Sequence, residues 1–196
     1  MYKIAVLVSG SGSNLEAIID SINKEELNCT IEAVISDKEG AYGIKRAKDN
    51  NISTYIFSRK QYGDKLSSEI LKILEGKVDL IVLAGFLSIL KGDILEIFKN
   101  RIINIHPSLL PLFCGSHMYG IKVHEKVIES GVKVSGCTVH YVEAGIDTGN
   151  IILQKTVAVC SDDTALTLQK RVLEQEHIAL PEVIRMKINE SEAKIK

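Results

Sequence analysis

The chain has 196 residues, of which 45% are hydrophobic and 25% are charged, an ordinary composition for a water-soluble globular protein. Its 24 Lys and Arg residues against 25 Asp and Glu residues give a formal net charge of −1, which argues against a broad basic surface for DNA or RNA. No apolar run reaches the roughly 18 residues of a membrane span, and the four scattered cysteines form no Cys-x-x-Cys pair, so we expect a cytoplasmic protein without membrane, nucleic-acid or metal partners.

Strand-like apolar runs alternate with amphipathic helical patterns through most of the chain. The expected strands are 3–8, 31–36, 53–57, 78–86 and 101–106. The expected helices are 15–22, 42–50, 65–76, a short one near 92–99, and 121–131. Strands that are apolar on both faces and alternate with helices are typical of parallel sheets. We therefore expect an α/β fold, a Rossmann-like, mostly parallel twisted sheet with helices on both faces.

The pattern changes toward the end of the chain. Two long strands, 132–142 and 150–159, follow each other, and we expect them to extend the sheet with antiparallel pairing. The segment 164–188 has a long helical pattern with Pro181 inside it, which predicts a kink or two helices. No repeat, low-complexity tract or shift in composition marks a linker, so residues 1–196 are expected to form one domain.

The loop after the first strand, SGSGSN (9–14), has the composition of an anion site. Gly10 and Gly12 permit a tight turn and close approach of a ligand to backbone N–H groups. Ser13 and Glu16 have the spacing of a capping box at the start of a helix. Because a helix N-terminus attracts negative charge, we expect a phosphate group here. A tight turn without a ligand is the alternative.

The same loop has a second functional interpretation, the Gly-x-Gly-x-x-Gly motif of dinucleotide-binding proteins. Leu15 stands where the third glycine belongs, which weakens this interpretation. Asp37, after the second strand, keeps it open, because an acid in that place binds a ribose hydroxyl. The lysine of a P-loop is missing, which argues against an NTPase.

Asn104 and His106 lie two residues apart at the end of the strand 101–106. Side chains at i and i+2 of a strand point to the same face, so the amide of Asn104 and the imidazole of His106 should lie on the same side of the sheet. The segment LAGFLSIL (83–90) follows another strand, and its apolar residues suit either a flat ligand or plain core packing. Because ligands of open parallel sheets bind at the carboxyl ends of the strands, these loops predict one shared site.

Asp147 lies in a glycine-flanked loop between the last two strands. If that loop folds back over the edge of the sheet, its carboxylate approaches His106 and favours the protonated imidazole. Asp and Gly are also common turn residues, so a purely local role for Asp147 is the alternative.

Four segments together resemble the glycinamide ribonucleotide transformylase family, the folate-dependent formyltransferases of purine biosynthesis. They are SGSGSNLEAI, VLAGF, NIHPSLLP and DTGNIILQ, in the order and spacing of that family. NIHPS alone is shared with other formyl-tetrahydrofolate enzymes, whereas SGSGSN near the start favours the transformylases. The resemblance implies transfer of a formyl group from 10-formyltetrahydrofolate to the amine of N1-(5-phospho-D-ribosyl)glycinamide, with a formyltransferase fold.

The resemblance also implies roles for individual residues. Asn104 would donate to the oxyanion of the tetrahedral intermediate, His106 would stabilise its charge, and Asp147 would sustain the protonated histidine. Other positions match the family's ligand contacts: Gly12, Ser13 and Asn14 for the phosphate, Glu176 for the glycinamide side, and Arg59, Leu87, Ser88, Ile89, Leu90 and Asn104 for the folate. No metal or covalent intermediate is implied, the partners are small molecules, and a monomer or homodimer is expected.

Two stretches depart from the family pattern. Ser88 stands where the family often has Arg, so one side-chain contact with the folate is absent or different. The loop 112–120 replaces a Pro-Gly turn, with Cys114 in the place of the Pro. The family often places histidines in this loop, and His117 is the residue here that can take their role.

Three other functions remain open at this point. A deformylase of the same family would release formate to water. A protein that binds nucleotide or folate without catalysis would not require Asn104, His106 and Asp147 together. An oxidoreductase that uses a dinucleotide would require the missing third glycine of the loop.

Overall fold

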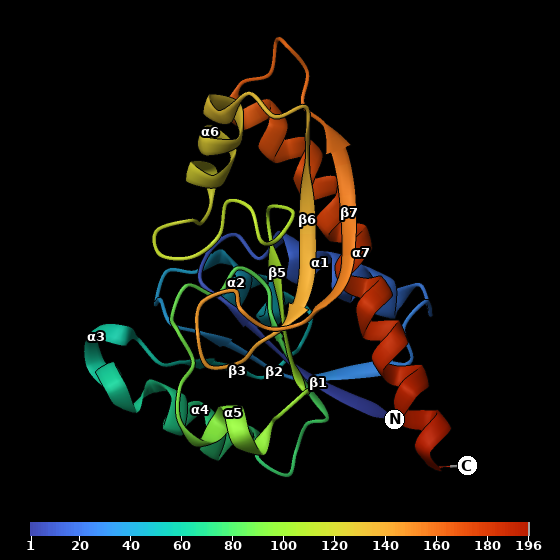
Figure 1. Ribbon diagram of the computed structural model, residues 1–196. Helices are drawn as coiled ribbons and strands as arrows, with labels where there is room; N and C mark the ends of the chain where they lie inside the picture. The colour runs from blue at the N-terminus through green and yellow to red at the C-terminus, as the bar shows by residue number, and fades with distance from the viewer. Residues whose placement is uncertain (196) are drawn as a thin grey trace.

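One seven-stranded sheet runs through the structure, a computed structural model that describes residues 1–195 (Figure 1). The strands are β1 (Tyr2–Val8), β2 (Cys29–Ser36), β3 (Thr54–Ile56), β4 (Leu80–Leu83), β5 (Ile102–His106), β6 (Val134–Tyr141) and β7 (Ile151–Ala158). Their order in the sheet is β3-β2-β1-β4-β5-β6-β7. Neighbours from β3 to β5 pair in parallel, whereas β6 pairs antiparallel with both β5 and β7. The predicted fold class is confirmed.

Helices cover both faces of this sheet. They are α1 (Ser13–Asn23), α2 (Tyr42–Asp49), α3 (Arg59–Tyr62), α4 (Leu66–Leu74), α5 (Asp93–Ile97), α6 (Ile121–Ser130) and α7 (Ala165–Ile195), with a 3₁₀ turn η1 (Gly63–Lys65) before α4. Side chains of β1 alternate between two cores. Ile4 and Val6 pack toward α1, α2, α6 and α7, and Ala5 and Leu7 pack toward α4 and α5. The two cores hold the carboxyl ends of the parallel strands at one edge.

Several predicted elements are shorter in the structure, among them the strand expected at 78–86 and the helix expected at 65–76. The strand expected at 78–86 is only β4, because the chain leaves the sheet and turns at Gly85, whose φ of +75° suits glycine. The helix expected at 65–76 is α4; Lys65 belongs to the preceding 3₁₀ turn η1, and the helix ends at Leu74, before Gly76. The four-residue helix α3 was not predicted, since it is too short to show a hydrophobic period.

The C-terminal helix α7 runs through Pro181 as one element, so the alternative of two helices is wrong (Figure 1). Its buried side chains lie on both sides of the proline, and they include Val172, Leu180 and Ile184. Proline removes one hydrogen bond from a helix interior. Here the helix packs along β6 and β7 over much of its length, and tertiary packing of this kind outweighs the local preference for a break.

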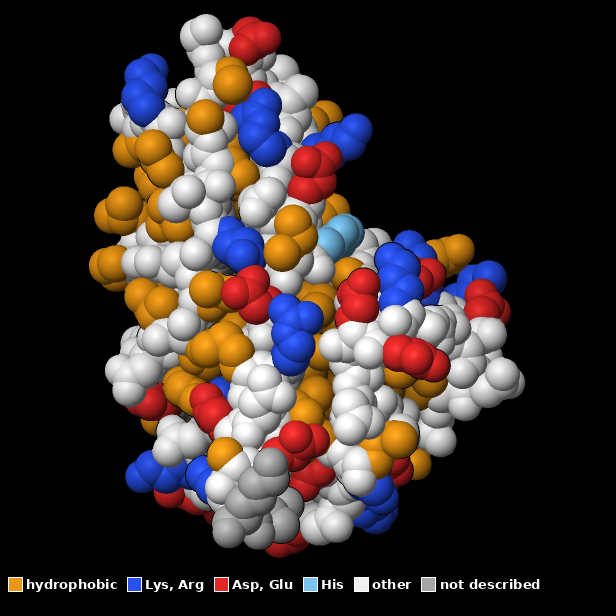
Figure 2. All heavy atoms as spheres, turned by 90° about the vertical axis from the view of Figure 1, so that its right-hand side faces the viewer, with side chains coloured by type: hydrophobic (Ala, Val, Ile, Leu, Met, Phe, Trp, Pro, Cys, Tyr) orange, Lys and Arg blue, Asp and Glu red, His pale blue; other side chains and the backbone are white. Residues whose placement is uncertain are grey.

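The surface over α7 and β7 carries both signs of charge. Figure 2 shows Lys and Arg side chains interspersed with Asp and Glu side chains on this face, without a field of one sign. This distribution agrees with the near-zero formal net charge of −1. Within residues 1–195, no helix is both long and apolar enough to span a membrane.

Replacing Ile70 by alanine tests the second core. Ile70 lies on α4, is completely buried, and packs against the sheet. Because alanine favours helix, the loss comes from burial and the cavity, and we expect about 2–5 kcal/mol less free energy of unfolding. Urea denaturation measures it. Leu166→Ala, at a position 69% exposed, is the control and should change stability little; equal effects would contradict the assigned packing.

Candidate active site

A cavity of about 500 Å³ opens at the carboxyl edge of the sheet. Its walls come from the loops after β1, β4 and β5, from the loop before α6, from the loop between β6 and β7, and from α7. Ligands of open parallel sheets bind at this edge. Of the residues expected at a site, Ser13, Asn14, Asn104, His106, Asp147 and Glu176 line the cavity, as do Leu87, Ser88, Ile89 and Leu90.

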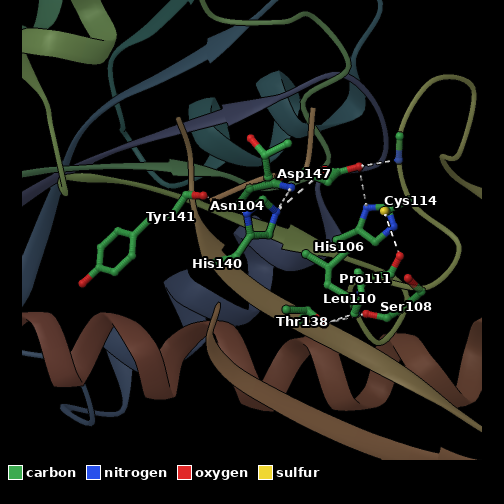
Figure 3. Close-up of polar contacts among 12 residues, drawn as sticks. Asn104, His106, Ser108, Leu110, Pro111, Cys114, Thr138, His140, Tyr141 and Asp147 are labelled. Carbon is green, nitrogen blue, oxygen red and sulfur yellow. Dashed lines mark hydrogen bonds and ion pairs between the residues drawn. The ribbon is translucent and has the colours of Figure 1, made fainter. Parts of the chain in front are cut away.

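His106 ends β5 and is buried, with both ring nitrogens facing oxygen atoms (Figure 3). Its Nε2 lies 2.9 Å from the carbonyl oxygen of Phe113, which can only accept a hydrogen bond, so Nε2 carries a proton. Its Nδ1 lies 3.7 Å from Oδ2 of Asp147. A protonated imidazole can therefore donate toward acceptors on both sides of the ring, and its orientation is fixed by the Phe113 carbonyl.

Asp147 lies between two histidines. Its Oδ2 accepts a hydrogen bond of 3.1 Å from the backbone N–H of Gly115, and its Oδ1 lies 3.7 Å from Nε2 of His140 (Figure 3). The residue has a φ of +57°, a conformation that Asp and Asn adopt more readily than other residues with a side chain. The β6–β7 loop thus folds over the sheet edge and brings a carboxylate to the end of β5.

Asn104 and His140 face each other across the β5–β6 pair. His140 Nδ1 donates to its neighbour's carbonyl, Tyr141 O, at 2.8 Å, which leaves Nε2 as an acceptor. Asn104 Nδ2 lies 3.0 Å from that Nε2 and donates to it (Figure 3). Burial lowers the pKa of His140, which favours the neutral ring that this hydrogen bond requires. One N–H of the Asn104 amide is thereby held, and the second is left for a ligand.

His124 is a further histidine of the cavity that sequence reasoning missed, as it also missed the role of His140. His124 lies on α6, is buried, and its Nδ1 has no hydrogen-bond partner among residues 1–195. Burial, and secondarily the charge of His106, lowers the pKa of His124 to about 4. Nothing in the pattern of the helix distinguishes this residue. The signal for His140 is the strand register, which a single sequence does not give.

The first turn of α1 presents backbone N–H groups without helical partners. The first intrahelical bond runs from Glu16 N to Gly12 O at 3.0 Å, so the amides of 13–15 remain for a ligand. Gly12 has a φ of +69°, and a Cβ on it would lie 2.6 Å from the Cα of Gly43. Gly12 is therefore required by the packing of α1 on α2 as well as by any ligand.

The predicted capping box is wrong. Gly12 is the N-cap residue, and no side chain caps the helix. Ser13 is already the first helical residue, and the carboxylate of Glu16 is drawn to Arg46, with Oε2 2.7 Å from Nη1. An ion pair with α2 has replaced the reciprocal cap.

Asn14 and Glu176 meet at the other end of the cavity. Asn14 Nδ2 donates to Oε2 of Glu176 at 2.7 Å, and both side chains are buried. Burial raises the pKa of Glu176, while the hydrogen bond from Asn14 opposes the shift. The Oδ1 atom of Asn14 is buried with no hydrogen-bond partner among the described residues. This pair therefore offers an acceptor and a carboxyl group to a polar ligand next to the helix N-terminus.

The residues expected to bind folate differ in their exposure and in whether they line the cavity. Leu87 and Ile89 are exposed, whereas Ser88 is buried, with its hydroxyl bonded to Asp37. Arg59 is exposed on α3 and does not line the cavity. His117, in the unusual 112–120 loop, does line it and has a φ of +67°.

Comparison with known proteins gives a consistent family. The model of the family described as Formyl transferase matches residues 2–184. Phosphoribosylglycinamide formyltransferase of Bacillus subtilis (strain 168) is 39% identical over 188 residues, 94% of each chain. The trifunctional purine biosynthetic protein adenosine-3 of Gallus gallus is 43% identical over 187 residues. The chain spans less than a fifth of that protein, 18%, although the match covers 94% of this chain.

Solved structures agree with these relatives. Glycinamide ribonucleotide transformylase 1 from Symbiobacterium toebii has a TM-score of 0.88 to this structure at 41% sequence identity, and the match covers 94% of this chain and 86% of that one. Phosphoribosylglycinamide formyltransferase from Bacillus halodurans also has a TM-score of 0.88, at 37% identity and 96% coverage of both chains. The later antiparallel strands are part of the shared fold.

His124 should make the protein sensitive to acid. The unfolded histidine takes up a proton as the pH falls through about 6.5, whereas the folded one stays neutral to a pKa of about 4. The neutral His124 therefore contributes to the free energy of unfolding above pH 6.5, and this contribution, up to about 3 kcal/mol, is lost as the pH falls toward 4. Urea denaturation from pH 7.5 to 4.5 should show a smaller loss for His124→Leu than for the native protein.

His117→Gln, a change at an exposed histidine, is the control and should keep the native pH dependence. A direct readout is the NMR titration of the His124 ring in the native protein. Titration of that ring near pH 6.5 would contradict the assigned environment, whatever the variants do.

Proposed function

The chain belongs to the formyl transferase family, and from this premise we propose that it transfers the formyl group of 10-formyltetrahydrofolate to the amine of N1-(5-phospho-D-ribosyl)glycinamide, a step of purine biosynthesis. The products are the N2-formyl ribonucleotide and tetrahydrofolate. One observation carries the proposal. Asn104, His106 and Asp147 line the same cavity as the helix N-terminus at Ser13, which supports a formyl-transfer centre beside a phosphate site.

The proposed reaction begins when the unprotonated amine attacks the formyl carbon. A C–N bond forms and the carbonyl electron pair moves to oxygen, giving a tetrahedral oxyanion. The second N–H of Asn104 donates to that oxygen. Protonated His106 stabilises the oxyanion through its positive charge, since its two ring nitrogens face the Phe113 carbonyl and Asp147. Loss of one such donor costs on the order of 10²–10³ in rate. The bond to folate N10 then breaks, the proton lost by the amine is returned to N10, and the imidazole is positioned to help move it.

Asp147 supports this chemistry through His106. Its Oδ2 lies 3.7 Å from Nδ1 of His106, so its negative charge faces the ring that carries the positive charge in the proposed mechanism, without contact with the reacting atoms. In the same proposal, the first turn of α1 at Gly12, Ser13 and Asn14 binds the phosphate, and Glu176 faces the glycinamide side. The apolar surface of 87–90 receives the folate. Arg59 can contact only a part of the folate that extends beyond the cavity.

The dinucleotide alternative loses its main support. Both carboxylate oxygens of Asp37 accept hydrogen bonds from serine hydroxyls, Ser9 at 2.5 Å and Ser88 at 2.7 Å. An acid that binds a ribose needs a free oxygen directed at the ligand. We propose residues 1–196 as one formyltransferase domain that acts on small molecules without a metal, as a monomer or homodimer.

Turnover should require the amine. We expect tetrahydrofolate release from 10-formyltetrahydrofolate only when the ribonucleotide is present, because the phosphate-bound amine is the nucleophile. Absorbance of the folate and an assay for free formate measure this. Equal release of formate without the amine would indicate a deformylase, and binding of both ligands without turnover would indicate a non-catalytic binding protein.

His106 and Asp147 should act as one unit. Asp147→Asn keeps an acceptor for the Gly115 N–H and suits the left-handed backbone, so mainly the charge is removed. We expect kcat to fall at least about 10-fold for Asp147→Asn and more for His106→Ala, with the KM values little changed. In the His106→Ala background, Asp147→Asn should add almost nothing. Multiplied losses would show that Asp147 acts independently of His106 and would contradict the single unit.

A further inference from the structure

Asp37 is a buried carboxylate that the proposed reaction does not use. It follows β2 and is 7% exposed. Among residues 1–195, no cation lies within ion-pair distance of it. Its side-chain partners are two hydroxyls: Ser9 Oγ donates to Oδ1 and Ser88 Oγ donates to Oδ2. A buried charge without such donors is costly, so the three side chains depend on one another.

Ser9 connects this carboxylate to the turn at Gly85. Its backbone N–H donates to the carbonyl of Gly85 at 3.0 Å, and its hydroxyl accepts from the backbone N–H of Leu87 at 2.7 Å. The hydrogen bonds therefore run in series, from Leu87 N–H to the Ser9 hydroxyl and on to Asp37. Chains of this kind strengthen each member in a low-dielectric interior. The ends of β1, β2 and β4 are joined by this chain.

The side chains of residues 86–90 alternate between buried and exposed, and all five residues line the cavity. Phe86, Ser88 and Leu90 are buried, whereas Leu87 and Ile89 are exposed by 42% and 58%. Ser88 is thus the polar member of the inward-facing set, and its hydroxyl reaches Asp37. The far end of the segment is held by a hydrogen bond from Lys91 N to Ser67 Oγ at 3.0 Å.

We infer that Ser9, Asp37 and Ser88 form a hydroxyl–carboxylate clamp that fixes residues 86–90 before substrate binds and so positions the folate co-substrate. These are positioning residues, because none of the three is placed against the reacting atoms. The inference rests on the proposed function for the identity of the ligand. It also gives a structural role to the departure at Ser88: a short hydroxyl side chain at this position can turn inward and complete the clamp.

Removing the Ser88 hydroxyl should leave Asp37 buried with one donor and release the segment. A loosened segment must be ordered when the ligand binds, which weakens binding without changing the chemical step. For Ser88→Ala we expect the KM for 10-formyltetrahydrofolate to rise about 10-fold, with kcat and the KM for the ribonucleotide within about twofold. Ser88→Thr retains the hydroxyl and should recover most of the native KM.

Ser135→Ala is the matched control. Ser135 is buried on β6, but its hydroxyl has no hydrogen-bond partner among the described residues, so the variant removes a buried hydroxyl without opening the clamp. It should keep the native KM for both substrates. If Ser88→Ala does not fold, Ser9→Ala, which removes both a donor to Asp37 and the acceptor of the Leu87 N–H, tests the clamp through the KM for 10-formyltetrahydrofolate.

Hydrogen exchange of the free protein tests the clamp without any substrate. The Leu87 amide should be protected in the native protein and exchange at least about 10-fold faster in Ser88→Ala. An unprotected Leu87 amide in the native protein, or a Ser88→Ala variant with native exchange and native folate KM, would overturn the inference. If the native protein transfers no formyl group, the exchange result still decides the clamp, and the failure belongs to the proposed function alone.

Discussion

The antiparallel pairing of β6 with β5 is the constraint on which the candidate site depends. Its register places His140 opposite Asn104 and Thr138 opposite His106. Thr138 then fixes the turn that follows β5: its hydroxyl donates to Ser108 O at 2.7 Å and accepts from Leu110 N at 3.0 Å. Because that turn supplies the Phe113 carbonyl that holds the His106 ring, one strand pairing orients both polar side chains at the end of β5.

The same pairing sets where the loop that carries Asp147 begins. Because β6 is antiparallel to β5, it ends beside the start of β5, with Tyr141 opposite Ile103, and the return to β7 folds back along the sheet to reach the carboxyl end of β5. Asp147 sits in that return, and its Oδ2 also accepts the Gly115 amide of the loop before α6. Two long loops are thereby tied to one carboxylate. In the proposed enzyme, the group that supports His106 also closes this side of the cavity.

Patterns of local origin were predictable from the sequence, and features set by distant packing were not. The i, i+2 spacing of Asn104 and His106 follows from strand geometry alone, and the structure places both side chains in one cavity. The predicted capping box is absent because Glu16 forms an ion pair with Arg46 of α2 instead. The buried hydroxyl of Ser88 donates to Asp37, which is 51 positions away in the sequence. Hydrophobic periodicity cannot predict a contact between residues so far apart in the chain.

His106 and His140 both face the carboxylate of Asp147. The two rings differ in the hydrogen bond that the other ring nitrogen makes. His140 donates from Nδ1 to a carbonyl and accepts at Nε2 from Asn104, and burial lowers its pKa. A proton on Nε2 of His140 would remove the acceptor that the Asn104 amide uses and would face Oδ1 of Asp147, 3.7 Å away. Keeping His140 neutral therefore does two things in the proposed mechanism. It leaves the charge of Asp147 for His106, and it lets His140 hold one N–H of Asn104, so that the other N–H can donate to an oxyanion.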